Sequence, residues 1–272
     1  MMWKPRKLHW SLHQHCCLKN ETSCCHNHWY FYNHHIFCIM IKRLGILGGM
    51  GPAASAEFIT RLIKQTPATH DQEHMPFVLW NEPRIPDRST SMQAGNNAPL
   101  LWLLQGIQAL KTVGCDQIVI PCNSAHFWYD DMAKMGVPII HIVDSIADQL
   151  RELALENTTI GIIGTQGTIE HGLYQTRLTQ QGWTCIVPDR AEMDFFVQPA
   201  IDFIKAGKIT ESQVLLMKTI HSLIDRGAQA IVLGCTELPL SIRITSVEGV
   251  PVVNSIDSLV QAVFTCWPMD YP

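Results

Sequence analysis

The feature that most constrains the fold of this chain is an internal repeat with an interval of 113 residues. Cys122 follows the apolar run QIVIP, and Cys235 follows the similar run AIVLG. The segment GVPIIHIVDSI begins at Gly136, and the related segment GVPVVNSIDSL begins at Gly249. Positions 122 and 235, 136 and 249, and 144 and 257 are each 113 residues apart. Several matches in one register indicate a duplicated structural unit.

Each unit contains short apolar runs that alternate with helical stretches. Runs without polar alternation are typical of strands buried on both faces, as in parallel sheets covered by helices. We therefore predict an α/β fold with two similar doubly wound parallel-sheet lobes, related by pseudo-twofold symmetry, with the active site between them. We expect strands in the runs at 43–49, 76–83, 117–122, 137–142, 159–165, 184–188, 230–235 and 250–255. We expect helices over Ala53–Gln65, Ala98–Val113, Ser145–Leu155 and Gln213–Arg226.

The expected first lobe comprises residues 40–145 plus about 256–272, so that a C-terminal helix crosses back to it, and the second comprises 146–255. Ligands of such sheets bind at the carboxyl ends of the strands. Cys122 and Cys235 would each be the first residue after an apolar strand. If the lobes face each other, both thiols therefore point into one cleft.

Residues 1–39 differ from the rest, because they hold five of the ten cysteines and seven of the thirteen histidines without helical or strand periodicity. Three interpretations remain open: a His/Cys metal site, a disordered tail, or a reading frame begun too far upstream. The spacings match no known ligand motif. We favour the third interpretation, because Met40 directly precedes the expected strand Ile41–Leu47. Under either of the last two interpretations, residues 1–39 take no part in the function.

Composition excludes several classes of partner. Hydrophobic residues make up 47% of the 272 positions, charged residues 16%, and the net charge is −4. This balance predicts no attraction to nucleic acid, and no apolar run approaches the roughly 20 residues that span a bilayer. The five cysteines beyond residue 39 are spread singly. They form no disulfide framework, which predicts a cytoplasmic enzyme.

The two repeated cysteines are the strongest candidates for chemistry. In PCNSAH and GCTELP, each thiol lies at a strand end with hydroxyl or amide side chains after it, namely Asn123, Ser124 and Thr236. A following helix would lower the thiol pKa toward neutrality, where a thiol can act as a general acid or base. The alternative is that each cysteine is a small buried apolar residue. Equivalent positions in a repeat favour the catalytic interpretation.

Three further motifs remain ambiguous from the residues alone. LGGMGP (47–52) is a glycine-rich turn into a helix that could hold an anion or, formally, a dinucleotide. Arg88 in the expected loop IPDRST is either a carboxylate ligand or a solvated cation. Lys205 ends an expected helix before Gly207, where the helix dipole favours any lysine. His126 and His171 suit core or supporting positions better than catalysis.

Taken together, these motifs resemble those of the aspartate/glutamate racemase family, and specifically its aspartate racemase branch. The matching segments are LGGMGP, DQEHMPFVLWNEPRIPDRS, PCNSAH, GTQGTI, FIKAGKIT and GCTELPL, which cover roughly residues 40–265. The resemblance implies catalytic roles for Cys122 and Cys235, and implies a homodimer with no cofactor and no metal. It implies that Arg88 and Lys205 bind the side-chain carboxylate of the substrate. It also implies that the amino-acid head group is surrounded by Met50, Asn123, Ser124 and Thr236.

The expected reaction is therefore racemisation of an acidic amino acid, with aspartate favoured over glutamate. One cysteine removes the Cα proton as a thiolate, and the other delivers a proton to the opposite face. One alternative keeps the fold but changes the reaction, as in the related maleate isomerases, arylmalonate decarboxylases and hydantoin racemases. Another is a nucleotide-binding α/β protein that uses LGGMGP as a phosphate loop.

Overall fold

The computed structural model describes residues 30–32, 35–37 and 42–267. The chain divides into two compact units, Met1–Ile41 and Lys42–Pro272. In the first unit, β1 (Tyr30–Tyr32) pairs antiparallel with β2 (His35–Phe37). The rest of the cysteine- and histidine-rich extension lies outside the described residues, and the three interpretations of it stay predictions.

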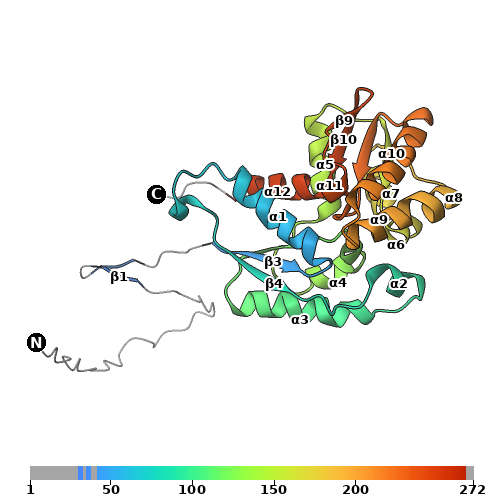
Figure 1. The fold of residues 1–272 in the computed structure, drawn as a ribbon. Helices are drawn as coiled ribbons and strands as arrows, with labels where there is room; N and C mark the ends of the chain where they lie inside the picture. Colours follow the sequence, from blue (N-terminus) through green and yellow to red (C-terminus); the bar gives the residue numbers. More distant parts are fainter. Residues whose placement is uncertain (1–29, 33–34, 38–41, 268–272) are drawn as a thin grey trace, which may run out of the picture. The chain divides into compact units, whose positions relative to one another are not determined.

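The second unit contains two separate sheets (Figure 1). The smaller is entirely parallel, in the order β4-β3-β5. The larger has the order β7-β6-β8-β10-β9 and is parallel except for β9. The strands are β3 (Leu44–Gly48), β4 (Phe77–Asn81), β5 (Gln117–Val119), β6 (Thr159–Ile163), β7 (Thr184–Ile186), β8 (Ala230–Leu233), β9 (Ser246–Val247) and β10 (Val250–Asn254). These sheets confirm the predicted α/β class.

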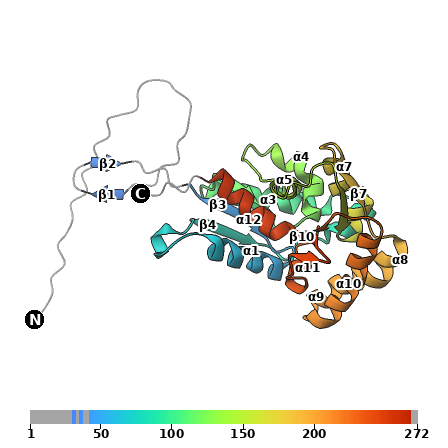
Figure 2. The same ribbon diagram turned by 90° about the horizontal axis from the view of Figure 1, so that it is seen from above.

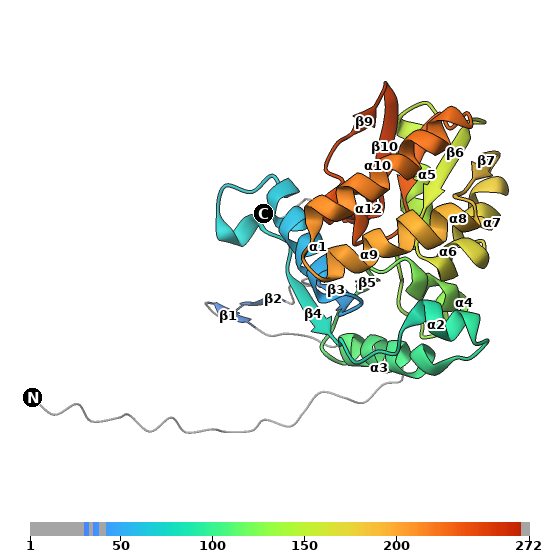
Figure 3. The same cartoon turned by 45° about the vertical axis from the view of Figure 1, so that its right-hand side comes forward.

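Helices cover the sheets. The longer ones are α1 (Pro52–Gln65), α3 (Ala98–Thr112), α5 (Ile142–Glu152), α9 (Gln198–Lys205), α10 (Ile209–Asp225) and α12 (Ser255–Cys266). The shorter ones are α2 (Arg88–Gln93), α4 (Tyr129–Ala133), α6 (Gln166–Glu170), α7 (Leu173–Thr179), α8 (Arg190–Glu192) and α11 (Leu238–Ser241), with single turns η1 (Asp71–Glu73), η2 (Ser124–Trp128) and η3 (Met193–Val197). Helices α9 and α10 run side by side (Figure 3). Across residues 30–32, 35–37 and 42–267, no helix has both the length and the apolar character of a membrane span.

The strand β3 shows why the sequence lacks polar alternation. Leu44 and Ile46 belong to a large apolar cluster that also contains Phe58 of α1, whereas Leu47 belongs to a second cluster with Leu103 of α3. The strand is thus covered on both faces, as its uninterrupted apolar run predicts. The larger cluster extends through the larger sheet, so the two sheets share one continuous core.

One expected strand is wrong and one was missed. The run at 137–142 makes only an isolated parallel bridge, between Ile118 and Ile139, and α5 begins at Ile142. The side chain of His141 accepts a hydrogen bond from the N–H of Val143, which starts the helix before a strand can extend. The missed strand, β9, forms a hairpin with β10 through Glu248 and Gly249, both with positive φ, as tight hairpin turns require.

The repeat is visible at the starts of two long helices. The N-cap of α5 is His141 and that of α12 is Asn254, which are 113 residues apart. Both caps accept a backbone hydrogen bond through their side chains. Helix α12 packs against both α5 and α1, and Figures 1 and 2 show it (red) beside α1 (blue). The lobe boundaries and the pseudo-twofold symmetry themselves remain predictions.

Candidate active site

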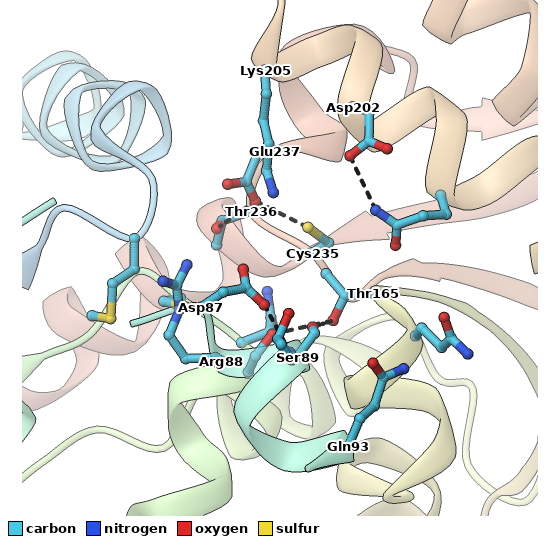
Figure 4. Close-up of a pocket in the computed structure, with 17 residues that line it drawn as sticks. Asp87, Arg88, Ser89, Gln93, Thr165, Asp202, Lys205, Cys235, Thr236 and Glu237 are labelled. Carbon is cyan, nitrogen blue, oxygen red and sulfur yellow. Dashed lines mark hydrogen bonds between the residues drawn. The ribbon is translucent and has the colours of Figure 1, made fainter. Parts of the chain in front are cut away.

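The residues predicted from sequence lie together in one pocket of about 270 Å³ (Figure 4). The pocket is lined by all eight of them: Met50, Arg88, Cys122, Asn123, Ser124, Lys205, Cys235 and Thr236. Seven of them lie in the segments that follow strands β3, β4, β5 and β8, and Lys205 ends α9. The carboxyl ends of strands from both sheets therefore converge on this pocket, as is general for ligand sites in α/β folds.

Local structure around three of these residues differs in detail from expectation. Neither cysteine directly follows its strand, because β5 ends at Val119 and β8 ends at Leu233. Arg88 does not lie in a loop: it is the first residue of α2, whose N-cap Asp87 accepts a hydrogen bond from Thr90 N–H at 2.8 Å. A short polar segment carries little periodicity, which is why this helix was missed.

Cys235 is held by a carboxylate that the sequence reasoning missed. Its thiol donates to Oε2 of Glu237 at 3.0 Å, and Oε1 of Glu237 accepts from the N–H of Gly51 at 3.2 Å. Cys235 is 3% exposed and Glu237 is 8% exposed. An acidic residue two positions after a candidate catalytic cysteine, in GCTELP, was the available signal.

The glycine-rich turn therefore holds an anion from within the chain. The N–H of Gly51 donates a hydrogen bond to Glu237, and the N–H of Gly49 donates to Oγ of Ser55 at 3.0 Å. Gly49 has a φ of 98°, and a Cβ there would lie 2.4 Å from the backbone of Glu82. The turn thus requires glycine for backbone packing, and a phosphate would have to displace Glu237. This disfavours the nucleotide-binding alternative.

Cys122 has a different environment. It is 4% exposed, and the Arg88 guanidinium is its principal charged neighbour. The backbone carbonyl of Cys122 accepts a hydrogen bond from Nδ1 of His126 at 2.9 Å. Burial lowers the pKa of His126 to about 4, so at neutral pH its ring is an uncharged donor. His126 therefore supports the loop that carries Cys122, in agreement with its predicted supporting position.

The prediction that both thiol pKa values fall toward neutrality is wrong for this structure. Burial raises the pKa of Cys122 above its ordinary value, although Arg88 opposes that rise. Burial raises the pKa of Cys235 well above its ordinary value, and the Glu237 carboxylate adds to the rise. The segments after the cysteines are short: the 3-10 helix η2 leads directly into the five-residue α4, and α11 has four residues. Their helix dipoles do not offset the cost of desolvation at either thiol.

Two hydrogen-bond networks fix the polar side chains of Asn123 and Ser124, which follow Cys122 and line the pocket. The amide of Asn123 donates to Oγ of Ser255 at 2.9 Å and accepts from the hydroxyl of Tyr174. The hydroxyl of Ser124 lies 3.2 Å from those of both Thr165 and Thr168. These contacts connect η2 to α6, α7 and α12 and hold the pocket wall in one geometry.

The two cations of the pocket keep free hydrogen-bonding capacity. The Nε of Arg88 is buried without a partner among the described residues. Its Nη1 donates two long bonds, of 3.4 and 3.3 Å, to the carbonyls of Ile85 and Pro86, and the guanidinium also interacts with the Cys122 thiol. Lys205 extends from the end of α9 toward Glu237 (Figure 4). Within the part of the chain that the structure describes, no acidic side chain forms an ion pair with Lys205.

Nothing in the described part of the chain resembles a metal centre, since no group of three or more His, Cys, Asp or Glu side chains gathers there. Apart from His35 in β2, the candidate metal ligands of residues 1–39 lie outside that part. His171, the other ambiguous histidine, lies beside the Gly167 carbonyl and does not line the pocket.

Comparison with known proteins identifies the family to which the chain belongs. The family model described as "Asp/Glu/Hydantoin racemase" matches residues 47–263. The solved structure of Picrophilus torridus aspartate racemase is similar with a TM-score of 0.71 and 29% identity, covering 83% of this chain and 94% of that one. The broad-specificity amino-acid racemase RacX of Bacillus subtilis is 26% identical over 82% of this chain and 97% of its own length.

The chain therefore belongs to the Asp/Glu/hydantoin racemase family, and its enzyme class is that of the amino-acid racemases. A glutamate racemase from Francisella tularensis shares the fold, with a TM-score of 0.60 and 16% identity. These relatives confirm the predicted family resemblance.

Proposed function

We propose that this enzyme racemises acidic amino acids, aspartate first among them, with Cys122 and Cys235 as the two acid/base groups. The observation that carries the proposal is that both thiols line one pocket together with Arg88 and Lys205, and that Nε of Arg88 is buried there without a partner among the described residues. The similarity to an aspartate racemase over most of both chains supports the same choice of substrate.

In the proposed mechanism, a thiolate of one cysteine removes the Cα proton and the thiol of the other delivers its own proton to the opposite face. The bond from Cα to hydrogen breaks on one side and a new one forms on the other, so no redox change occurs. The reverse reaction exchanges the two roles. The scheme needs no cofactor, because the two sulfur atoms supply both the base and the acid.

Arg88 and Lys205 are the proposed ligands of the side-chain carboxylate. A guanidinium offers two parallel donors that match a carboxylate, and Nε of Arg88, which has no partner in the described part of the chain, is available for this use. Met50, Asn123, Ser124 and Thr236 would surround the head group. Fixing both ends of the substrate leaves the Cα–H bond aligned with a sulfur atom, which is the main benefit of a preorganised site.

The test is chiral chromatography of L-aspartate and L-glutamate after incubation with the wild type, Cys122→Ala and Cys235→Ala. We expect each variant to lose at least about 100-fold in rate, the usual cost of removing a general acid or base. Cys115→Ala is the matched control, because Cys115 is also buried but does not line the pocket. A variant at either pocket cysteine that racemises aspartate at the wild-type rate would refute the scheme. Racemisation of glutamate alone would refute the choice of substrate.

A further inference from the structure

The two cysteines occupy corresponding positions of the repeat but have unlike neighbours two residues further on. Ser124 follows Cys122 at that distance, whereas Glu237 follows Cys235. The Ser124 hydroxyl is bonded to hydroxyl groups of the pocket wall. The Glu237 carboxylate is instead bonded to the thiol itself. The two halves of the repeat therefore differ at a position whose side chain, in the second half, contacts a reactive sulfur.

Glu237 is fixed from both sides. One carboxylate oxygen accepts the thiol of Cys235 at 3.0 Å, and the other accepts the N–H of Gly51 at 3.2 Å. Gly51 is the N-cap of α1, a helix of 14 residues. The amino end of a long helix carries partial positive charge, which stabilises a carboxylate there. A buried acidic side chain with both oxygens engaged cannot easily turn away from the sulfur.

The opposite sulfur has a cation as its principal charged neighbour. The Arg88 guanidinium lies close enough to Cys122 to lower the pKa of that thiol against the effect of burial. The backbone N–H of Ala125 acts in the same direction. Glu237 also raises the pKa of Cys122, but less than Arg88 lowers it. A thiolate at Cys122 is thus compensated by positive charge, whereas a thiolate at Cys235 would face the Glu237 carboxylate at hydrogen-bond distance.

We propose that Glu237 is a positioning residue that holds Cys235 as the proton-bearing thiol of the resting enzyme, so that Cys122 is the resting base. The proposal rests on the proposed function only in giving these thiols acid and base roles. When a turnover moves a proton from substrate to Cys122 and from Cys235 to product, the thiolate left on Cys235 faces Glu237. That state is unfavourable, so proton exchange with solvent returns the pair to its resting form.

The decisive measurement is the pH dependence of alkylation of each cysteine by iodoacetamide, read by peptide mass spectrometry on the full chain without substrate. Only the thiolate reacts, so the midpoint reports the ionisation of each sulfur. In the wild type we expect Cys122 to react at a lower pH than Cys235. In Glu237→Gln we expect the Cys235 midpoint to fall by at least about one pH unit, which gives about tenfold more thiolate at a fixed pH below it.

A control variant separates this effect from the general charge of the pocket. Asp202 also lines the pocket, but its carboxylate accepts from Gln198 and contacts neither thiol. We expect Asp202→Asn to leave the order and the midpoints of both cysteines unchanged. Equal shifts in Asp202→Asn and Glu237→Gln would overturn the proposal.

The pH–rate profile of racemisation gives a second readout, which would stay unchanged if Glu237 had only a structural role. In a two-group mechanism, the alkaline limb of the pH–rate profile reports the group that must stay protonated. We expect this limb to move to lower pH in Glu237→Gln.

If Glu237→Gln fails to fold, the order of the alkylation midpoints of Cys122 and Cys235 in the wild type alone can overturn the proposal. Cys235 reacting first, or both cysteines together, would do so. The alkylation assay requires no turnover, so a chain without racemase activity that keeps the expected order would refute the proposed function and leave this inference standing.

Discussion

At the scale of single residues, recognition of the substrate depends on Arg88. Replacing it with lysine keeps the positive charge but removes the planar pair of donors. We expect Arg88→Lys to raise KM for aspartate by about 10- to 100-fold, since a hydrogen bond to a charged group contributes about 1.5–3 kcal/mol. The matched control is Arg84→Lys, because Arg84 is an exposed arginine paired with Glu82 outside the pocket. Steady-state kinetics with an unchanged KM in Arg88→Lys would contradict the assignment.

His126 gives the protein a predictable sensitivity to acid. Burial lowers its pKa to about 4, below the ordinary value of 6.5. A depressed folded-state pKa contributes stability that is full above about 6.5 and is lost as the pH falls toward 4. The contribution is up to about 3 kcal/mol.

We expect His126→Asn, whose amide can still donate to the Cys122 carbonyl, to lose less unfolding free energy than the wild type between pH 6.5 and pH 4. Urea unfolding at each pH measures this loss. An unchanged slope would show that His126 is not the group responsible.

The sequence predicts where a residue lies when its location follows from the order of strands and helices. It does not predict a property, such as a thiol pKa, that depends on the residue's environment in the fold. Cys122 and Cys235 could be placed near one site because the carboxyl ends of parallel strands meet there, whereas Arg88 and Lys205 were ambiguous from the residues alone and were placed there by the family resemblance. The thiol pKa values could not be inferred, because they depend on burial and on Glu237. That carboxylate acts on Cys235 through a contact that also needs Gly51, 186 residues away in sequence.

At the scale of elements, the pocket depends on how closely α2 approaches α6. A Cβ on Gly167 of α6 would lie 2.9 Å from the Cα of Ser89 in α2, closer than real contacts allow. Gly167→Ala must therefore separate the two helices and displace the adjacent Arg88. We expect a several-fold rise in KM for aspartate. The thermal unfolding midpoint should fall only slightly, because the helix propensity of alanine, about 1 kcal/mol above that of glycine, partly offsets the clash. Unchanged kinetics would mean that this contact does not set the pocket.

The elements that sequence predicted best are those whose burial is uniform. Strands β3 and β8 are buried throughout, β6 is buried except at Thr159, and all three were found from their apolar runs. The run at 137–142 has the same composition, yet it yields a single bridge because the cap at His141 begins a helix. Apolar composition alone cannot distinguish a strand from a helix start here, since the N-cap at His141, inside the run, decides between them.

At the scale of the whole molecule, the catalytic unit is expected to work without the extension. Residues 42–272 and residues 1–41 belong to different units of the chain, and every pocket residue belongs to the unit 42–272. We expect a chain that begins at Met40 to keep the racemase rate and thermal unfolding midpoint of the full chain, with equal metal content by elemental analysis. Loss of activity on removal of residues 1–39 would contradict this. The homodimer remains a prediction that sedimentation of either chain can test.

The central claim, that two sulfur atoms act from opposite faces of one carbon, is tested most directly by racemising L-aspartate in deuterated water at low conversion. Mass spectrometry of the separated enantiomers follows the hydrogen on Cα. The account predicts that D-aspartate carries solvent deuterium from its first appearance, because the delivering thiol has exchanged with solvent, while unreacted L-aspartate stays largely protiated. D-aspartate that retains the original proton would show that a single group removes and returns it, and would contradict the account.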